Sequence, residues 1–465
     1  MQKLFLDCYE MDKRCYDEYG LSEDILMENA ASSIARYIEE NFPKQSSILI
    51  VAGSGNNGAD GITLSRLLNG AYKVYLYLPV GAKSNMAKIQ LKRAKSVGVQ
   101  IVDDIKNADV IVDSIFGAGL NKPLSSDIAI IVSQLNPLSG FKIACDIPTG
   151  IDKRGRIGSV AFRADVTVTM GALKEALYLD EAKDYVGEII CANLGVEREV
   201  YEFPSNSYLL ESSDFRAPFR EQKSSHKGSF GHCAIFCGEK EGAGIISAMA
   251  ATRFGAGLTT LVVHEKVTHP PHIMHSTTIP QNTTAIAIGM GLGNFFENEF
   301  LLEVVKSNVP IILDADALFK DTLLAILKQK NREVVITPHP KEFAKLLSKI
   351  EELNLSVEEI QKNRFDIAKE FGKNYPNVVL VLKGANPIII KGEKLYVNPL
   401  GTNLLAKGGS GDILSGLIAS LLAQGYSAID SAIHASLALA LASNRFKGNN
   451  YAITPLDIIE ELRYL

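Results

Sequence analysis

The 465-residue sequence lacks any uninterrupted apolar run approaching the ~18 residues that suggest a membrane span. Its first residues, "MQKLFLDCYEMDKR", interrupt their apolar run with Asp7 and Glu10, unlike the apolar region of a secretory signal. It also has no polybasic block, and its net charge is −5. These absences argue against a membrane or nucleic acid as a partner.

Cysteine is scarce as well, with six residues and no C-x-x-C motif. Without a secretory signal, this pattern predicts reduced thiols and a cytoplasmic location. Cys233 and Cys237 lie four residues apart on an expected strand, so we expect two buried free thiols on one face. The histidine-rich segment "HEKVTHPPHIMH" has no carboxylate or cysteine at a familiar metal-binding spacing, and we expect a surface loop.

What the sequence does contain is a regular alternation of short apolar runs with longer amphipathic segments. The cores of runs such as "SILIVA" and "VVLVLKGA", "ILIVA" and "VVLVL", are apolar throughout, which is typical of parallel strands buried on both faces. The pattern stops near Pro204 and restarts at "HCAIFCG". The length also favours more than one domain. We therefore predict two doubly wound α/β domains, residues 1–204 and 205–465.

The stretch "VAGSGNNGADG" follows the first of these strands and precedes an expected helix. Gly53, Gly55 and Gly58 satisfy G-x-G-x-x-G, so backbone N–H groups could face an anion there. An ordinary dinucleotide site also needs a carboxylate at the end of the next strand, but "VYLYLPVG" has none. The usual redox-cofactor interpretation is therefore weakened, and a glycine-rich turn without a ligand stays open.

Two aspartates end further strands, Asp113 in "VDSIFGAGL" and Asp146 in "DIPTGID". Ligands of open α/β sheets gather at the carboxyl ends of strands, so both could converge with the glycine loop on one crevice. Asn57, Asp113 and Thr149 offer oxygen ligands that suit a hard cation. The alternative for each aspartate is a helix N-cap.

The motifs "GSGNNGADG", "VDSIFGAGL" and "DIPTGID", in this order, resemble the N-terminal domain of NAD(P)H-hydrate epimerases. Ala59 and Thr149 stand where that family more often has Gly and Ser. The resemblance implies a Rossmann-like domain with K⁺ at Asn57, Asp113 and Thr149, and Asp146 as the general acid/base. The implied ligand is a dinucleotide whose nicotinamide ring has added water, bound as substrate. The implied substrate-binding residues are Asn56, Asn57, Gly58, Ala59, Asp60, Gly117, Ala118, Gly119, Leu120, Asn121, Lys122, Pro123 and Asp146.

The sharpest pattern in the second half is "NLLAKGGSGDILSG", in which glycines precede an apolar helix. Their amides could stabilise a transferring phosphoryl group. Asp412 at the helix start could take a proton from a substrate hydroxyl. The alternative is an aspartate that only caps the helix.

Together with "HKGSFG", "DADAL", "TPHPKEF" and "KGANPII", this pattern resembles the ribokinase-like superfamily and, within it, the ADP- or ATP-dependent NAD(P)H-hydrate dehydratases. Ser410 replaces the usual Thr, and "CGEKEGAG" replaces the usual Gly-Gly-Ser after the first strand, which leaves the contacts of that loop open. The resemblance implies that the hydrate lies near Gly291, His339 and Asp412. The implied nucleotide-binding residues are Lys383, Gly384, Ala385, Asn386, Pro387, Asn403, Lys407, Gly408, Gly409, Ser410 and Gly411.

The two resemblances imply a fused repair enzyme that interconverts the R and S forms of hydrated NAD(P)H. It dehydrates the S form back to NAD(P)H while ADP becomes AMP and phosphate. ADP is favoured over ATP on family grounds, Mg²⁺ is expected for phosphoryl transfer, and a homo-oligomer is expected by analogy. One alternative is a ribokinase-like small-molecule kinase with an N-terminal binding domain. Another alternative makes the first domain a binding module without catalysis. The presence of the motif residues Asn57, Asp113 and Asp146 argues against it.

Overall fold

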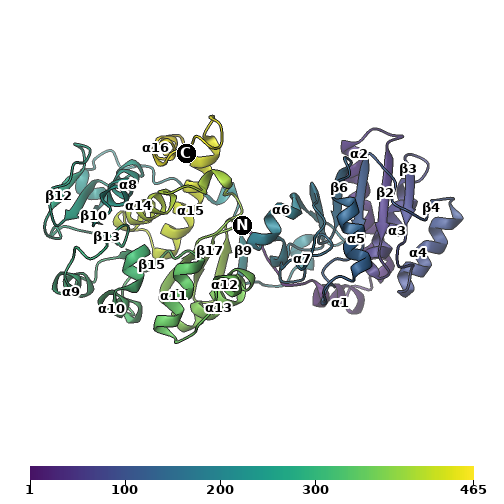
Figure 1. Ribbon diagram of the computed structural model, residues 1–465, viewed down its shortest axis with the longest axis horizontal. Coiled ribbons are helices and arrows are strands. Elements are labelled where there is room, and N and C mark those ends of the chain that lie inside the picture. Colours follow the sequence, from purple (N-terminus) through teal and green to yellow (C-terminus); the bar gives the residue numbers. More distant parts are fainter. The chain divides into compact units, whose positions relative to one another are not determined.

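The computed structural model describes residues 1–465 as two compact units, each considered by itself (Figure 1). The first unit comprises residues 3–205, and the second comprises residues 206–465 together with Met1 and Gln2. None of the helices combines the length and the apolar character that crossing a membrane would require.

A single sheet of seven parallel strands forms the centre of the first unit, in the order β4-β3-β2-β5-β6-β7-β8. The strands are β2 (Ser47–Ala52), β3 (Lys73–Tyr77), β4 (Gln100–Val102), β5 (Val110–Ser114), β6 (Phe141–Cys145), β7 (Val166–Met170) and β8 (Glu188–Ala192).

Helices cover both faces of this sheet. Successive residues of a strand point to opposite faces, and here they belong to two separate hydrophobic cores. Ile48 and Ile50 pack with residues of α2, α3 and α4, whereas Leu49 and Val51 pack with residues of α5 on the opposite face. The helices are α1 (Tyr9–Asp17), α2 (Glu23–Asn41), α3 (Asn56–Leu68), α4 (Asn85–Ser96), α5 (Ser126–Leu135), α6 (Lys183–Val186) and α7 (Arg198–Tyr201).

The second unit is built on an eleven-stranded mixed sheet, in the order β1-β9-β18-β17-β16-β15-β14-β13-β10-β11-β12. The strands are β1 (Gln2–Lys3), β9 (Ser207–Leu209), β10 (His232–Cys237), β11 (Leu258–Val263), β12 (Met274–Ser276), β13 (Ala285–Ile288), β14 (Ile311–Leu313), β15 (Val334–Ile336), β16 (Val378–Leu382), β17 (Ile388–Lys391) and β18 (Lys394–Val397). The strands β17 and β18 form an antiparallel hairpin. The short strands β1, β9 and β12 were not predicted.

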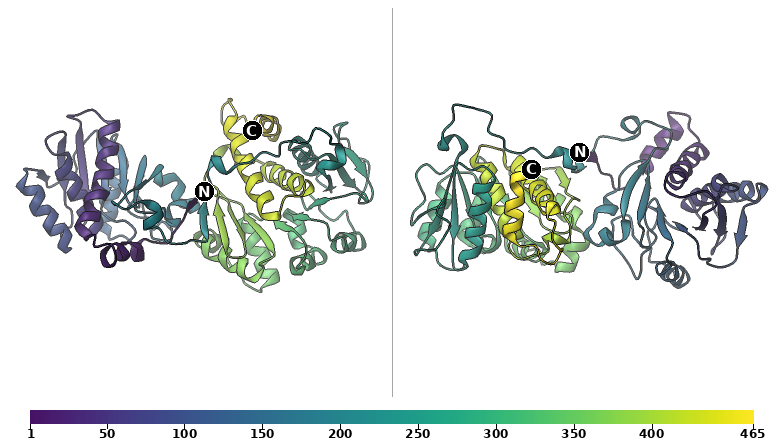
Figure 2. Two further views of the ribbon diagram at one scale, coloured as in Figure 1. Left: turned by 180° about the vertical axis from the view of Figure 1, so that it is seen from behind. Right: turned by 90° about the horizontal axis from the view of Figure 1, so that it is seen from above.

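Both faces of this sheet are covered too (Figures 1 and 2). The yellow helices α14 and α15 share one core with Val381 and Ile389, whereas α13 contacts the neighbouring Ile390 from the other face. The helices are α8 (Glu241–Arg253), α9 (Asn298–Lys306), α10 (Asp321–Leu324), α11 (Pro340–Ile350), α12 (Val357–Lys362), α13 (Arg364–Asn374), α14 (Ser410–Ala423), α15 (Ala428–Arg445) and α16 (Pro455–Glu461). The prediction of two doubly wound α/β domains is confirmed.

Each sheet has one point where the strand order reverses. In the first unit β2 lies between β3 and β5, and in the second unit β10 lies between β11 and β13. Loops at the carboxyl ends of such strands diverge to opposite faces and leave room for a ligand. The switch points therefore lie at the loop after β2 in the first unit and at the loops after β10 and β13 in the second.

Candidate functional site

The glycine loop after β2 is shaped mainly by packing of the backbone against itself. A Cβ atom on Gly53 would lie 2.0 Å from the Ile115 carbonyl oxygen, and one on Gly58 would lie 2.0 Å from the Gly53 carbonyl oxygen. Gly55 faces open space, and α3 begins at the next residue, Asn56. Two of the three glycines are thus required by the fold, and only the middle one leaves a close approach open to a ligand.

Asp113 lies on β5 beside this loop and is fully buried. The Thr149 backbone N–H donates to Asp113 Oδ2 at 2.7 Å, and the Thr149 hydroxyl donates to Oδ1 at 2.7 Å. Burial raises the pKa of Asp113 to about 6, although these hydrogen bonds oppose the shift. Asp113 is a strand residue rather than a helix cap. The structure therefore joins Asp113 and Thr149, as the sequence analysis expected of a cation site.

Asn57 and Asp146 meet at Gly117. A Cβ atom on Gly117 would lie 2.6 Å from Asp146 Oδ2 and 3.0 Å from Asn57 Oδ1, so only glycine fits between them. The Ala118 N–H donates to Asp146 Oδ2 at 2.8 Å. The Asn57 side-chain nitrogen is buried and has no hydrogen-bond partner. This orphaned amide, next to a carboxylate, marks a polar crevice that is not satisfied by the protein alone.

Asp146 is held in a strained and charged state. Its φ is +71°, which is uncommon for any residue other than glycine. Lys174, only 2% exposed, places its Nζ 2.8 Å from Asp146 Oδ1 and also donates to the Thr169 hydroxyl and the Met170 carbonyl. Burial alone would raise the pKa of Asp146, but the charge and hydrogen bond of Lys174 outweigh it and lower that pKa. Sequence reasoning missed Lys174; the available signal was a lone lysine among apolar residues after a strand.

Asp60 lies one helical turn after Asn57, so both project from the same face of α3. Burial, followed by the charges of Asp146, Asp12 and Glu23, raises the pKa of Asp60 well above its usual range. Its carboxyl group makes no hydrogen bond within the protein. The crevice thus holds two carboxyl groups in opposite states: Asp146 ionised and Asp60 favouring its proton.

The remaining predicted residues of this crevice are less closely involved. Asn56 donates to Glu23 Oε1 at 2.5 Å at the rim, and Leu120 is buried below the loop. Asn121, Lys122 and Pro123 are exposed and form no hydrogen bond with the carboxylates of the crevice.

In the second unit, the glycine loop leads directly into α14. Gly409 has a φ of +98° and caps this helix, and a Cβ atom on it would lie 2.5 Å from Pro455 Cγ. The Ser410 hydroxyl donates to the Leu405 and Lys407 carbonyls, which fastens the loop to the preceding turn. Asp412 lies in the first turn of α14 and is not the cap, so the capping alternative is wrong.

Two other loops bring charged side chains to this glycine loop. Lys383, after β16, places its Nζ 2.8 Å from Asp314 Oδ1 and 3.4 Å from where a Gly411 Cβ would be. Asp314, after β14, is buried and accepts a second hydrogen bond from the Ser415 hydroxyl at 2.9 Å. "DADAL" was part of the quoted pattern, but no role was predicted for Asp314, and Ser415 was not singled out.

Asp412 is half-buried, and its carboxylate accepts no hydrogen bond from the protein. Burial raises the pKa of Asp412 to about 6, the Asp314 charge adds to this, and Lys383 opposes it. A carboxylate with a pKa near neutrality can take a proton and release it again, which suits a general base.

Gly291 and His339 lie on loops at the same edge of the sheet. Gly291 follows β13 with a φ of +59°, and its carbonyl accepts from the Lys240 N–H at 3.0 Å. The divergent "CGEKEGAG" loop therefore contacts the loop after β13. His339 caps α11: its Nδ1 accepts from the Lys341 and Glu342 N–H groups, and its Nε2 lies 3.3 Å from Glu342 Oε1.

Asn403 and Lys407 occupy the exposed turn before the glycine loop, and the Lys407 ammonium donates to the Tyr451 carbonyl at 3.2 Å. In the loop after β16, Gly384 and Ala385 are exposed and Asn386 is buried. The predicted nucleotide-binding residues thus lie in two loops that meet at Lys383 and Gly411.

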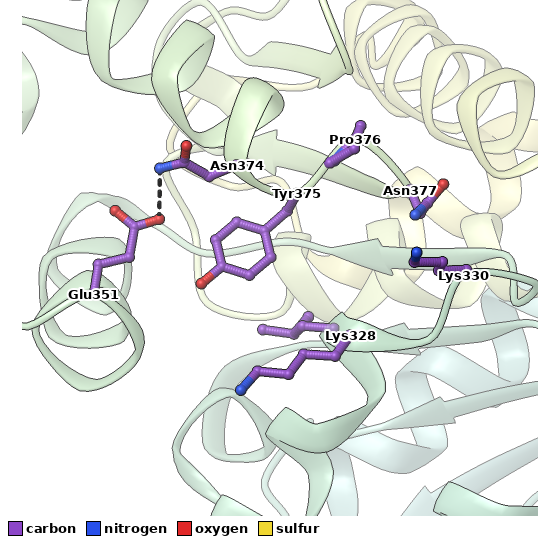
Figure 3. A pocket seen from close by; sticks show the side chains of 8 residues that line it. Lys328, Lys330, Glu351, Asn374, Tyr375, Pro376 and Asn377 are labelled. Atoms are coloured by element: carbon purple, nitrogen blue, oxygen red, sulfur yellow. Dashed lines mark hydrogen bonds between the residues drawn. The ribbon is translucent and has the colours of Figure 1, made fainter.

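A cavity of about 550 Å³ lies elsewhere on the second unit (Figure 3). It includes Asn377, which precedes β16, so it lies at the amino-terminal edge of the sheet, opposite Lys383. Figure 3 shows Lys328 and Tyr375 beside it and the 3.1 Å hydrogen bond from Asn374 to Glu351. Its lysines and Glu351 carry mixed charge, and no glycine loop reaches it. It is a weaker candidate than the glycine-loop site.

Cys233 and Cys237 are buried free thiols, as the sequence analysis expected. The expected histidine-rich surface loop is present only in part, because His275 lies on β12. His264, His272 and His275 are exposed, and His269 Nε2 lies 2.9 Å from His275 Nδ1.

Comparison with known proteins assigns both units. Residues 233–463 match the family model described as NAD(P)H-hydrate dehydratase, and residues 23–176 match the model described as YjeF-related protein N-terminus. A solved structure similar to part of this chain is that of ADP/ATP-dependent NAD(P)H-hydrate dehydratase from Bacillus subtilis, co-crystallized with ATP/Mg²⁺. It is 26% identical, with a TM-score of 0.47, and the match covers 53% of this chain and 92% of that one.

Curated relatives match over nearly their whole length. The bifunctional NAD(P)H-hydrate repair enzyme Nnr of Helicobacter pylori is 43% identical, and the match covers 98% of each chain. The enzyme of the same name from Dictyoglomus turgidum is 34% identical, over 97% of this chain and 95% of that one. Since these matches span both units, the chain belongs to the family of bifunctional NAD(P)H-hydrate repair enzymes, which combine an epimerase with a dehydratase.

Proposed function

We propose that residues 1–204 carry the epimerase and residues 205–465 an ADP-dependent dehydratase that acts on the S form of the hydrate. The observation that carries the proposal is the pair of unlike carboxylates: Asp146 paired with a buried lysine, and Asp412 without a partner at the head of a glycine-loop helix. The first suits a group that stays ionised, and the second suits a base that works near neutral pH.

For the dehydratase, Asp412 accepts the proton of the ring hydroxyl as that oxygen attacks the terminal phosphorus of the nucleotide. The phosphorus–oxygen bond to the leaving nucleotide breaks, and ADP becomes AMP. The N–H groups of the glycine loop and the Lys383 ammonium face the charge that develops on the phosphoryl group. The phosphate then leaves with the electrons of its carbon–oxygen bond, driven by the ring nitrogen, and loss of a proton from the adjacent carbon restores the dihydropyridine.

For the epimerase, the carbon–oxygen bond at the hydrated ring carbon breaks and re-forms on the opposite face, with a proton exchanged at the oxygen. Asp146 is the proposed acid/base for that exchange, and Lys174 fixes its carboxylate. Asp60, which favours its proton, can donate a hydrogen bond to the substrate. Asn57 and the loop from Gly117 complete the proposed substrate contacts.

Two inorganic ions belong to the proposal. The donors of Asn57, Asp113 and Thr149 suit K⁺, and a cation beside them would offset the burial that raises the pKa of Asp113. Asn57 would offer its Oδ1 to this cation, while its buried and unpartnered side-chain nitrogen would donate to an acceptor on the substrate. Mg²⁺ would accompany the phosphates of the nucleotide and neutralise part of their charge. ATP is the alternative phosphoryl donor, and the Bacillus subtilis enzyme was co-crystallized with ATP/Mg²⁺.

A cytoplasmic homo-oligomer is the remaining part of the proposal. All six cysteines are free thiols, which supports a reducing compartment. Light scattering of the purified protein would test the oligomeric state.

The decisive assay incubates the protein with hydrated NADH and ADP, or with ATP, and follows the return of reduced-nicotinamide absorbance. Recovery with ADP and release of AMP are expected. A stable phosphorylated product without recovered NADH would instead indicate a small-molecule kinase. No reaction with either nucleotide would overturn the dehydratase assignment.

A further inference from the structure

Arg364, the first residue of α13, is a fully buried arginine directly behind the loop after β16. It is 1% exposed. Its Nη2 donates to the carbonyls of Leu382 at 3.0 Å, Lys383 at 3.2 Å and Asn386 at 3.4 Å. One guanidinium thus contacts the end of the strand and both sides of the loop that follows. Such a planar, permanently charged group can hold several carbonyls in a fixed arrangement.

The direction of these carbonyls fixes the direction of the N–H groups. In a planar trans peptide the C=O and the following N–H point in opposite directions. Because the Lys383 carbonyl points inward to Arg364, the Gly384 N–H points away from it. Gly384 is exposed, and its N–H donates no backbone hydrogen bond within the protein. An outward, unpaired N–H in a glycine turn is the donor that an anion requires.

The same arrangement places the Lys383 ammonium. The Lys383 N–H donates to the Pro338 carbonyl at 2.9 Å, and the side chain reaches Asp314 and the vicinity of Gly411. The backbone of Lys383 is therefore held on one side by Pro338 and on the other by Arg364. Loss of the guanidinium would remove one hydrogen-bond donor from each of the three carbonyls, which favours a different loop conformation.

We propose that Arg364 is a positioning residue for the nucleotide: it orients the Gly384 N–H and the Lys383 ammonium toward the phosphates of a nucleoside di- or triphosphate. This inference rests on the proposed nucleotide site at Lys383–Pro387. Arg364 does not contact the nucleotide and acts only through the loop.

Arg332 provides a matched control in the same unit. It is 3% exposed, and its guanidinium donates to the carbonyls of Val309 at 2.6 Å, Val304 at 3.0 Å and Val305 at 3.4 Å. These carbonyls belong to the end of α9 and to the segment before β14, at the amino-terminal edge of the sheet. Arg332 thus has the same chemistry as Arg364 but no connection with the glycine loops.

The test compares Arg364→Lys with Arg332→Lys in the full chain. Lysine keeps the charge but not the planar set of donors. Calorimetry with ADP and Mg²⁺ should show that Arg364→Lys raises the Kd by about tenfold or more, whereas Arg332→Lys changes it by less than about twofold. Hydrogen exchange at Lys383–Asn386 without nucleotide should quicken only in Arg364→Lys. An ADP Kd within about twofold of the wild type in Arg364→Lys would overturn the proposal.

A second activity and a substitute variant distinguish a positioning role from a folding defect. Epimerase turnover on the same chain should be unchanged in both variants. If Arg364→Lys does not fold, Arg364→Gln takes its place; if both Arg364 variants unfold the second unit while Arg332→Lys folds, the role is in folding and the inference fails. Wild-type protein that binds neither ADP nor ATP would instead overturn the proposed function itself.

Discussion

Each unit places a lysine beside an aspartate at the carboxyl ends of parallel strands, but the two units pair different aspartates. In the first unit Lys174 pairs with Asp146, the proposed acid/base itself. In the second unit Lys383 pairs with Asp314, and the proposed base Asp412 has no partner. Pairing with Lys174 therefore lowers the pKa of Asp146. The pKa of Asp412, which lies outside the Lys383–Asp314 pair, is raised to about 6.

The comparison shows that a buried ion pair does not by itself define the state of a catalytic carboxylate. What matters is whether the carboxylate is a member of the pair or its neighbour, because a neighbour experiences both charges of the pair and they oppose each other. The nearby Asp314 raises the pKa of Asp412 and Lys383 lowers it, so burial decides the direction. The two sites could thus differ in their pH dependence on a similar framework.

Loss of the unpaired Asp412 carboxylate should have the largest effect. Asp412→Asn should lower dehydratase turnover by roughly 10²–10⁴-fold, since a positioned general base contributes about that much. Epimerase turnover should be unchanged. Recovery of NADH and the R-to-S interconversion, measured on the same preparation, separate the two effects. Dehydratase activity within about tenfold of wild type would exclude Asp412 as the base.

Removal of the lysine from the first pair should have the next largest effect. Lys174→Met leaves the Asp146 carboxylate buried without its counter-charge, which typically costs about 3–5 kcal/mol of stability. Epimerase turnover should fall while the dehydratase persists. Calorimetric unfolding and the two activity assays provide the measurements.

The double variant Lys174→Met/Asp146→Asn is the control for that prediction. It removes both charges, so it should regain most of the lost stability but none of the epimerase activity. If the double variant is no more stable than Lys174→Met, the ion pair at this site is not what stabilises the unit.

The pH profiles should differ in a way that follows from the two pKa shifts. Asp412 must be ionised to act as a base, so dehydratase turnover should fall as the pH drops below about 6. Asp146, whose pKa is lowered, stays ionised there, and K⁺ beside Asp113 would offset the burial that raises the pKa of that carboxyl group, so with saturating K⁺ the epimerase should keep its rate at that pH. Rates measured across the acid range with saturating substrates test this. A joint fall of both activities near pH 6 would contradict the comparison.

The smallest expected effect concerns the proposed cation. Replacement of K⁺ by choline should slow the epimerase several-fold, because Asp113 and the Asn57 amide lose their proposed cation. The dehydratase of the same chain serves as the control and should not respond. Equal sensitivity of both activities to K⁺ would point to a general salt effect instead.

Much of this arrangement was predictable because strand ends are visible in the sequence. Apolar runs that end in Asp113 or Asp146 place those side chains at the carboxyl edge, and the glycine pattern before Asp412 marks a helix start. The partners were not predictable: nothing in the local sequence of Lys174 or Ser415 shows which carboxylate lies opposite. Such pairs depend on the tertiary fold, with 27 residues separating Asp146 from Lys174 along the chain and 100 separating Asp314 from Ser415.

The roles of individual glycines were also hidden. Gly53 and Gly58 fit a ligand-binding fingerprint, yet the structure requires them because backbone segments cross there. The short strands β1, β9 and β12 have two or three residues each, too few to show a period of two.

The assignment of Met1 and Gln2 to the second unit has a consequence for how the chain is made. The strand β1 lies beside β9, which in turn pairs with β18 near residue 397, so its place in the sheet exists only after almost 400 further residues have been synthesised. At ~5–20 residues per second, this takes roughly 20–80 s. On the ribosome the first unit can therefore fold before Met1 and Gln2, which precede it in the chain, have a strand to pair with. The pairing of β1 with the sheet edge is then a late step in folding of the second unit.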